Sequence, residues 1–478
     1  MVSTVNEWKR SHPVPPGLPP KPVQCHAQAG VPSVRTTNHR PRSGSAFAGP
    51  RRRNRFLAAS AVTALVLGVT SACGGGSDPT ESAEQEQLAE GETLTITTFG
   101  EFGYDALIEE WNEANPDVQV EQTKVSLWDD WKNELNTLLQ ANEGLPDVVA
   151  VEGDFMPALV AAPERWVDLS SDEVEGRWLD FKEAAATTPD GALLGYATDA
   201  GPEAICYRSD LFKKAGLPTD RAEVAKLMGT WDDYYALGEK FVKALPNTAW
   251  YDASGSIAQA MLNQVEYPFE EADNTVNVEN PELEAVYETV TSHTEALSTK
   301  NAQWSDDWNA SYTNDGFATI PCPGWMRANI KTNTGEPAPK GVVWDIADVF
   351  PGGGGNWGGS YLTVPKSSTH QEEAQEFAAW ITAPEQQAKV FEVTGNFPSQ
   401  VEALEDPVVL ESTDEYFNNA PAGEIYSNRA AAIDVQPYHG PLYSDILGKF
   451  QDAINRVDQG TDPGESWDKF LSEVEALQ

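Results

Sequence analysis

The sequence predicts an α/β protein of two lobes, and three observations support this prediction. Strand and helix patterns alternate as β-α-β-α-β over residues 94–151, which is the order of a parallel sheet with helices on both faces. A second series of strands and helices begins after Gly201. The roughly 405 residues beyond Cys73 exceed what one hydrophobic core organises, so they suit two lobes.

The elements of the first lobe follow from the spacing of their apolar residues. Residues 94–98 alternate as a strand, and the apolar residues from Tyr104 to Trp111 then fall at i, i+3, i+4 and i+7, one face of a helix. Asn115-Pro116 ends that helix. The remaining elements expected here are a strand at 118–120, a helix at 128–139 and a short buried strand at 147–151.

The second series runs to the end of the chain. We expect strands at 203–207, 317–321 and 361–364, and helices at 231–245, 256–265, 374–381, 443–457 and from Pro463 onward. With these elements, the first lobe is expected to comprise residues 92–200 and 350–383. The second lobe is expected to comprise residues 201–349 and 384–478.

Ahead of the fold, the sequence has the pattern of a secretory signal with a lipid attachment site. A basic patch at 51–55 precedes the apolar run 56–69, and small residues then lead to Cys73. The apolar run is shorter than the roughly 20 residues of a membrane span, which makes a transmembrane helix the weaker alternative. We expect residues 1–73 to be a leader and lipoprotein signal peptide, with Cys73 lipidated, and the Gly-, Ser- and Glu-rich residues 74–91 to be a flexible tether.

Residues 1–50 carry scattered prolines and basic residues without apolar periodicity, a composition typical of disorder. Because such a signal is ordinarily N-terminal, we expect translation to start further along, near Val31 or Val34. A genuine long leader is the alternative.

The chain beyond Cys73 is strongly acidic. Its 73 Asp and Glu residues face 22 Lys and Arg residues, which gives a formal charge of −51. Such a surface repels phosphate backbones and anionic lipid, so a nucleic-acid-binding role is disfavoured and attachment to a membrane would depend on the lipid. The simplest use of the excess acid is solubility.

Two cysteines remain besides Cys73 and Cys25 of the leader. In an oxidising exterior Cys206 and Cys322 are expected to pair as a disulfide, closing a loop of 116 residues. Two buried free thiols are the alternative.

Motifs for phosphate, metal and nucleophilic chemistry are missing or incomplete. The glycine run 352–359 lacks the Lys-Ser/Thr of a P-loop, so we expect it to let backbone and the indole of Trp357 approach a ligand closely. His293, His370 and His439 are widely spaced and form no His-Glu-x-x-His motif, so neither a metal nor a cofactor is expected. No Gly-x-Ser-x-Gly elbow occurs.

The aromatic residues divide into two groups. Those that fit helix faces, and are expected in the core, are Trp111, Trp128, Trp380 and Trp467. Those that stand beside Gly, Pro or loop residues are Trp325, Trp357, Tyr361 and Tyr443. Flat rings with a polar edge suit the faces of sugar rings, while Asp, Glu and Asn bind sugar hydroxyls. The second group is therefore expected to bind a sugar.

Several segments together resemble the maltose-binding-protein-like family of extracellular solute-binding proteins, which serve ATP-driven sugar importers. The most specific segment is 207–218, with Tyr-Arg-Ser-Asp-Leu-Phe followed by Lys-Lys-Ala-Gly-Leu-Pro. The other segments, in family order, are 94–99, 145–149, 153–155, 195–196, 317–318, 323–326, 359–365 and 374–381. The resemblance covers nearly all of the chain beyond the leader.

The resemblance implies a periplasmic-binding-protein-like fold, with two lobes joined by a multi-crossing hinge and the ligand in the cleft between them. It implies binding, not catalysis: a monomer, anchored by lipid at the extracellular face of the cell membrane, delivers an oligosaccharide to an ABC permease with a cytoplasmic ATPase. Residues 322–326 and 355–361 are similar to those of relatives for cello-oligosaccharide uptake, which makes cellobiose or a cello-oligosaccharide the expected ligand.

The resemblance also assigns ligand-binding positions. Asp154 follows the third strand, Asp199 lies at the first crossing, and Trp325 takes the place of the stacking aromatic. Tyr443, with His439 just before it, begins the late helix.

Two more acids are assigned less specifically, namely Glu101 after the first strand and Asp252 before a helix N-terminus. Trp357 and Tyr361 are added from the glycine run and the strand after it. For each position, surface solvation or core packing is the alternative.

Two other functions stay open. A secreted glycoside hydrolase would use a pair of carboxylates, and any chain with so many acids offers such pairs. A surface adhesin or peptide-binding receptor would close the same lobes on something other than sugar.

Overall fold

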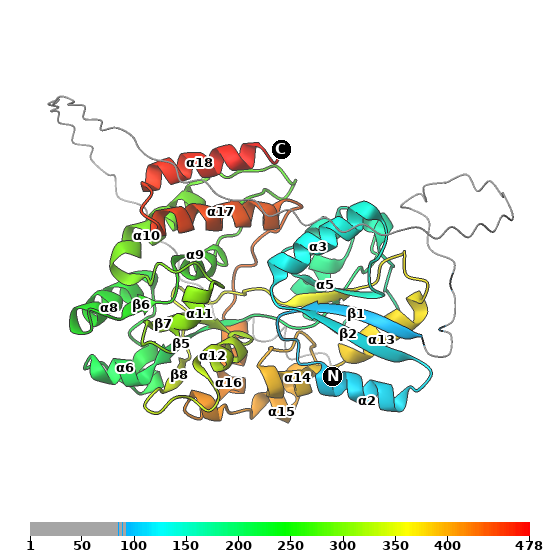
Figure 1. Cartoon of the computed structure of the whole chain (residues 1–478), viewed down its shortest axis with the longest axis horizontal. Coiled ribbons are helices and arrows are strands. Elements are labelled where there is room, and N and C mark those ends of the chain that lie inside the picture. Colours follow the sequence, from blue (N-terminus) through cyan, green and yellow to red (C-terminus); the bar gives the residue numbers. More distant parts are fainter. Residues whose placement is uncertain (1–84, 86–87, 89–91) are drawn as a thin grey trace, which may run out of the picture. The chain divides into compact units, whose positions relative to one another are not determined.

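We analysed a computed structural model of the chain, which describes residues 85, 88 and 92–478 (Figure 1). The predicted leader with Cys73, and the predicted tether apart from two residues, lie outside this described part. Within it, no helix has the length and apolar character needed to cross a membrane.

The first lobe is built on a five-stranded sheet of order β2-β1-β3-β9-β4. The strands are β1 (Thr93–Phe99), β2 (Gln119–Val125), β3 (Val148–Glu152), β4 (Tyr196–Ala197) and β9 (Ser360–Thr363). The parallel order predicted for the first three strands is confirmed. The other half of the sheet differs, because β9 enters from the second lobe and runs antiparallel to both β3 and β4.

Helices cover this sheet, as Figure 1 shows on its right-hand side. They are α2 (Asp105–Ala114), α3 (Trp128–Ala141), α4 (Met156–Val160), the 3-10 turn η1 (Pro163–Arg165), α5 (Asp180–Ala186) and α13 (Gln371–Ile381). The apolar stripes found in the sequence face the sheet: Trp111 and Trp131 are buried, and Trp111 packs edge-on against Phe377 at 5.3 Å between ring centroids. This packing places the ends of β1 and β3 at one edge of the lobe.

The second lobe is built on a four-stranded sheet of order β6-β7-β5-β8. Its strands are β5 (Glu203–Arg208), β6 (Ala249–Tyr251), β7 (Phe317–Pro323) and β8 (Trp344–Ala347). Alternate residues of β5 enter two different clusters: Ile205 and Tyr207 contribute to one, Ala204 and Cys206 to the other. Both faces of this sheet are therefore buried.

Many helices surround the second sheet. They are α6 (Ser209–Lys214), α7 (Arg221–Ala225), α8 (Trp231–Ala244), α9 (Ser254–Leu262), α10 (Pro281–Leu297), α11 (Asp306–Ser311), α12 (Met326–Thr334), α15 (Pro407–Leu410), α16 (Ala422–Ala431), α17 (Tyr443–Asp458) and α18 (Pro463–Glu475), with 3-10 turns η2 (Ala403–Glu405) and η3 (Glu415–Phe417). The helices predicted near 231–245, 256–265 and 443–457 correspond to α8, α9 and α17. Helix α10 was not predicted from the sequence.

One helix belongs to both lobes. In α14 (Pro384–Thr394), Val390 packs into the cluster of the first sheet, whereas Ala388 and Phe391 pack into a cluster of the second. The proposed lobe boundary at residue 383 thus falls just before a shared element.

A disulfide joins Cys206 on β5 to Cys322 on the neighbouring β7, with 5.4 Å between the two Cα atoms. Both side chains are fully buried. We expect the Cys206→Ala, Cys322→Ala double variant to lose about 4 kcal/mol of unfolding free energy, because its unfolded chain is no longer closed into a long loop.

Urea unfolding of the two proteins measures this difference. The wild type in reducing buffer serves as the control and should approach the double variant. Equal unfolding free energies in all three samples would contradict a stabilising role for the bond.

Candidate functional site

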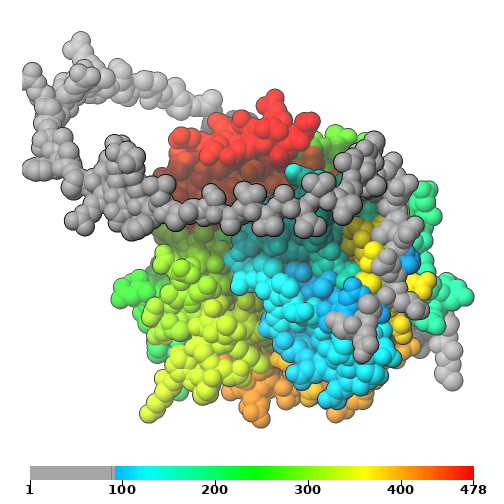
Figure 2. Space-filling view, turned by 45° about the vertical axis from the view of Figure 1, so that its right-hand side comes forward, coloured from blue at the N-terminus to red at the C-terminus, as the bar shows by residue number. Residues whose placement is uncertain are grey.

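The end of β3, the glycine run and the start of α12 converge on Gly358. A Cβ atom built on Gly358 would lie 3.8 Å from both Glu152 Oε1 and Trp325 Nε1. A Cβ atom on Gly153 would lie only 2.6 Å from the carbonyl oxygen of Gly359. Because only glycine permits such approaches, these residues bring side chains of both lobes together at one place. On the face drawn in Figure 2, the first lobe in blue and cyan lies directly against the second lobe in green.

Aromatic rings form one part of this site. Trp325 Nε1 donates a hydrogen bond of 3.0 Å to the carbonyl oxygen of Trp357. The two rings meet edge to face at 5.5 Å between centroids, and the ring of Trp304 lies 6.1 Å from that of Trp325. All three side chains are only partly buried. They can therefore offer ring surface to a ligand.

Carboxylates form a second part, at the end of β3. Asp154 Oδ1 is buried and, among the described residues, has no hydrogen-bond partner. Burial raises the pKa of Asp154 to about 6, although the positive charge of Lys132 opposes the shift. Burial and the neighbouring charge of Asp154 raise the pKa of Glu152 well above its usual range. The charge of Asp154 thus disfavours ionisation of Glu152, whereas the hydrogen bond from Glu152 favours the ionised form of Asp154.

A buried cation stands beside the first crossing. Asp199 accepts hydrogen bonds from Thr198 Oγ1 at 2.7 Å and from the backbone N–H of Ser360 at 2.9 Å. Burial raises the pKa of Asp199, and the charge of Lys182 opposes that shift. Lys182 is 3% exposed and its Nζ lies 4.2 Å from the ring centroid of Tyr361. Tyr361 is itself buried and donates from its hydroxyl to the carbonyl oxygen of Lys182 at 3.0 Å.

The second lobe contributes a stacked pair of rings. His439 lies on Tyr443, with 3.7 Å between ring centroids and 25° between planes. Burial and then the charge of Lys182 lower the pKa of His439 to about 3. Burial and then the charge of Asp154 raise the pKa of Tyr443. In both cases the second cause is a charged group of the first lobe.

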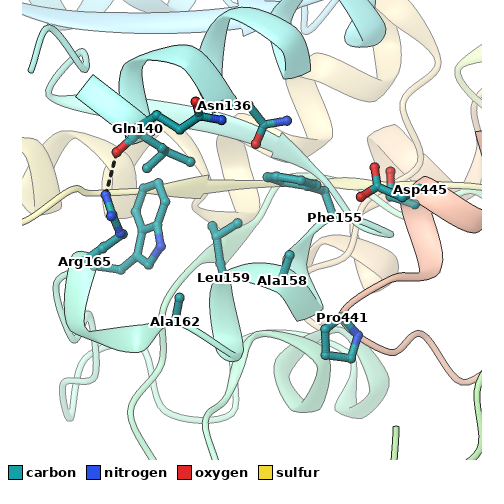
Figure 3. A pocket seen from close by; sticks show the side chains of 12 residues that line it. Asn136, Gln140, Phe155, Ala158, Leu159, Ala162, Arg165, Pro441 and Asp445 are labelled. Atoms are coloured by element: carbon teal, nitrogen blue, oxygen red, sulfur yellow. Dashed lines mark hydrogen bonds between the residues drawn. The ribbon is translucent and has the colours of Figure 1, made fainter. Parts of the chain in front are cut away.

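A polar bridge and a pocket lie next to this pair. Lys132 on α3 donates to Ser444 Oγ at 2.9 Å and to Asp445 Oδ1 at 2.8 Å, so it links the first lobe to the first turn of α17. Beside the bridge, a pocket of about 320 Å³ runs between α3 and α4 (Figure 3). Phe155 and Leu159 line it, and Asp445 lies at one end.

Of the residues expected to bind a ligand, Trp325 and Trp357 lie together, Asp154 follows β3, Asp199 lies at the first crossing and His439 lies on the second lobe. Tyr361 and Tyr443 differ from the expectation: they belong to β9 and α17 and are buried in the cores of the first and second lobes, so they offer almost no surface to a ligand.

Two of the acids expected to bind a ligand make their contacts outside this site. Asp252 has no exposed surface, and its two oxygens accept from Ser256 Oγ at 2.6 Å and Trp308 Nε1 at 2.8 Å. Glu101 is exposed, accepts from the N–H of Gly103 and lies 3.6 Å from Lys124 Nζ. Each carboxylate is engaged by groups of its own lobe, so neither acid enters the proposed site.

Three residues of the site were not predicted. Glu152 is the one polar residue closing the buried strand β3, a signal that the sequence offers two positions before Asp154. Lys182 and Trp304 gave no such signal, because only the fold brings them to the glycine run. In the described part of the chain, no group of three or more His, Cys, Asp or Glu side chains is arranged to hold a metal ion.

The raised pKa of Asp154 makes stability depend on pH. An unfolded Asp has a pKa of about 3.9, and folding raises that of Asp154 to about 6, so its ionisation destabilises the fold as pH rises through this interval. We expect Asp154→Asn to melt at a higher temperature than the wild type at about pH 7.5, with the difference shrinking toward about pH 4.5.

Scanning calorimetry across this range measures the effect, and Asp117→Asn, at an exposed position, is the matched control. A difference in melting temperature that stays constant with pH would show that the carboxyl of Asp154 is not destabilised by ionisation.

Comparison with known proteins places the chain. A solved structure described as extracellular solute-binding protein family 1 is 44% identical, with a TM-score of 0.72, and the match covers 80% of this chain and 99% of that one. The binding protein associated with an ABC transporter of B. animalis subsp. lactis Bl-04, solved with beta-1,6-galactobiose, has the same fold at 21% identity and a TM-score of 0.69, covering 81% of this chain and 97% of that one.

The arabinooligosaccharide-binding protein of Bacillus subtilis (strain 168) is 26% identical over 397 residues, which are 78% of this chain and 88% of the relative. The family model for bacterial extracellular solute-binding proteins matches residues 106–417. These matches confirm the two-lobed α/β fold expected from the sequence. The chain belongs to the bacterial extracellular solute-binding proteins.

Proposed function

We propose that this protein captures an oligosaccharide outside the cell and delivers it to the permease of an ABC importer, whose ATPase is cytoplasmic. The observation that carries the proposal is the meeting of Trp325 and Trp357 with the carboxyl group of Glu152 at one place between the lobes, with Asp154 two residues further along the chain. Ring faces bind the apolar faces of sugars, and carboxylates accept from sugar hydroxyls. The sugars named for the two relatives above support the same class of ligand.

Binding would couple to movement of the lobes. Tryptophan rings come from the second lobe and the glycine run, while the carboxyl groups come from the last residue of β3 and from the turn after it in the first lobe. A sugar that contacts both sets stabilises the closed arrangement over the open one, and the closed protein then docks on the permease. The protein itself forms and breaks no covalent bond in this scheme, so it is not an enzyme.

Several finer points belong to the proposal. The ligand to test first is cellobiose or a cello-oligosaccharide, as the resemblance in residues 322–326 and 355–361 suggests. The mature protein would be a monomer, held at the extracellular face of the cell membrane by lipid on Cys73, with residues 74–91 as tether. It would need no cofactor and no metal.

Titration calorimetry of residues 75–478 tests the proposal, because these residues form one compact unit. The panel is cellobiose, cellotriose, maltose, chitobiose, xylobiose and arabinobiose, and the sugars are analysed after each run. Saturable one-to-one heat with the sugar recovered intact is expected. Cleaved sugar would instead indicate a glycoside hydrolase, and no heat with any sugar would contradict an oligosaccharide ligand.

Replacing Trp325 should weaken the binding of the sugar. We expect Trp325→Ala to cost about 1–3 kcal/mol of binding free energy, the hydrophobic contribution of one such ring, which is a roughly 5- to 150-fold higher Kd. Trp467→Ala is the control, since Trp467 packs against Tyr287 and Phe470 in the second lobe. Equal Kd values for the Trp325 variant and the wild type would remove Trp325 from the site.

A further inference from the structure

Lys182 places a buried ammonium group in the site without an acceptor. The residue is 3% exposed, and within the described part of the chain its Nζ makes neither a hydrogen bond nor an ion pair. Its contact is with the ring face of Tyr361, 4.2 Å from the centroid. An ammonium carries three donors. Lys182 Nζ is not among the fully buried atoms without a partner, so it keeps some accessible surface. Its donors are therefore available to a ligand.

The position of Nζ relates it to the rest of the site. A Cβ atom on Gly359 would lie 2.7 Å from Lys182 Nζ. The preceding residue, Gly358, is the one whose Cβ atom would lie 3.8 Å from both Glu152 Oε1 and Trp325 Nε1. The ammonium thus stands one residue away from the point where carboxyl groups and tryptophan rings meet.

Charged groups surround Lys182 from several elements. The charges of Asp199 at the crossing, then of Glu152 and Asp154 at the end of β3, favour its protonated form, while burial opposes it and lowers its pKa to about 8. The charge of Lys182 in turn helps to lower the pKa of His439 in the second lobe, after burial. Helix α5 itself adds two further acids, the exposed Asp180 and the partly exposed Glu183. Acids therefore outnumber bases around this ammonium.

We propose that Lys182 is a ligand-binding residue that, together with Glu152 and Asp154, takes a pair of neighbouring hydroxyls of an uncharged sugar. A hydroxyl oxygen accepts from the ammonium, and the hydroxyl proton is donated to a carboxylate, so each group finds the partner that it lacks. An acidic sugar would bring a further negative charge toward the acids of the site. The inference rests on the proposed function and specifies its ligand as neutral.

The test compares Lys182→Met with the wild type in residues 75–478, by calorimetry with the neutral sugars of the panel and with glucuronosyl-glucose as the acidic disaccharide. The wild type is expected to prefer the neutral sugar. Lys182→Met should raise the Kd for that sugar at least tenfold while leaving the melting temperature equal or higher, because it removes a buried charge. Lys226→Met, at an exposed surface lysine, is the matched control and should change neither value.

A pH profile of the wild type gives a second measurement that needs no variant. If the protonated ammonium binds the sugar, affinity weakens as pH rises from about 7 to about 9.5. The pKa values of about 6 for Asp154 and about 3 for His439 lie below this range. Burial also raises the pKa of Glu152 and of Asp199, but ionisation of these acids with rising pH would strengthen their acceptance from sugar hydroxyls, so a loss of affinity over this range is assigned to Lys182.

The outcomes separate the two proposals. Heat with a neutral sugar, but with the same Kd in Lys182→Met or a level pH profile, overturns the role of Lys182 and leaves the oligosaccharide function standing. Tighter binding of glucuronosyl-glucose than of any neutral sugar overturns the inference of an uncharged ligand. Absence of heat with every sugar overturns both.

Discussion

The rest of the structure depends on how closely the two crossing segments, residues 198–203 and 355–360, lie against each other. A Cβ atom on Gly201 would be 1.8 Å from the carbonyl oxygen of Trp357, and one on Gly359 would be 2.5 Å from that of Asp199. Backbone hydrogen bonds hold the segments together, including Trp357 N to Gly201 O at 2.8 Å. This contact fixes Trp357, positions the side chain of Asp199 against β9, and so sets the geometry of the whole site.

The site gathers groups that a stable interior would avoid. Among the described residues, an oxygen of Asp154 and the hydroxyl of Tyr443 are buried without a partner, and the ammonium of the buried Lys182 lies over the Tyr361 ring. Each such group lowers stability in the absence of a ligand. A ligand with many hydroxyls can form hydrogen bonds with several of these groups at once. The stability that the unpaired groups cost the free protein is then recovered as binding free energy.

Strong periodicity made much of the fold predictable, whereas tertiary contacts decided the rest. Helices α8 and α17 carry clear apolar stripes and were predicted, whereas α10 buries Thr291 and Thr294, which weaken its stripe, and it was missed. In the site, the resemblance assigned Asp154 and Trp325, and the glycine run suggested Trp357; their binding of a ligand stays a prediction. Asp252 also stood at a strand-to-helix junction in the sequence. In the structure its carboxylate accepts a hydrogen bond from Trp308, 56 residues away, and is buried. The burial of Lys182 could not be predicted from the sequence, because it arises only when β9 packs over α5.

The place of β9 in the first sheet also has a consequence for the order in which the chain can assemble. β9 lies between β3 and β4 in the first sheet, where its Tyr361 pairs with Val151 of β3. Every strand of the second sheet precedes β9 in the sequence. As the chain emerges from the ribosome, the lobe that begins first must wait with an open strand edge until the other sheet has been made. The first sheet therefore cannot be completed before β9 has been made, and its late, long-range strand pairing is the slow kind of folding step.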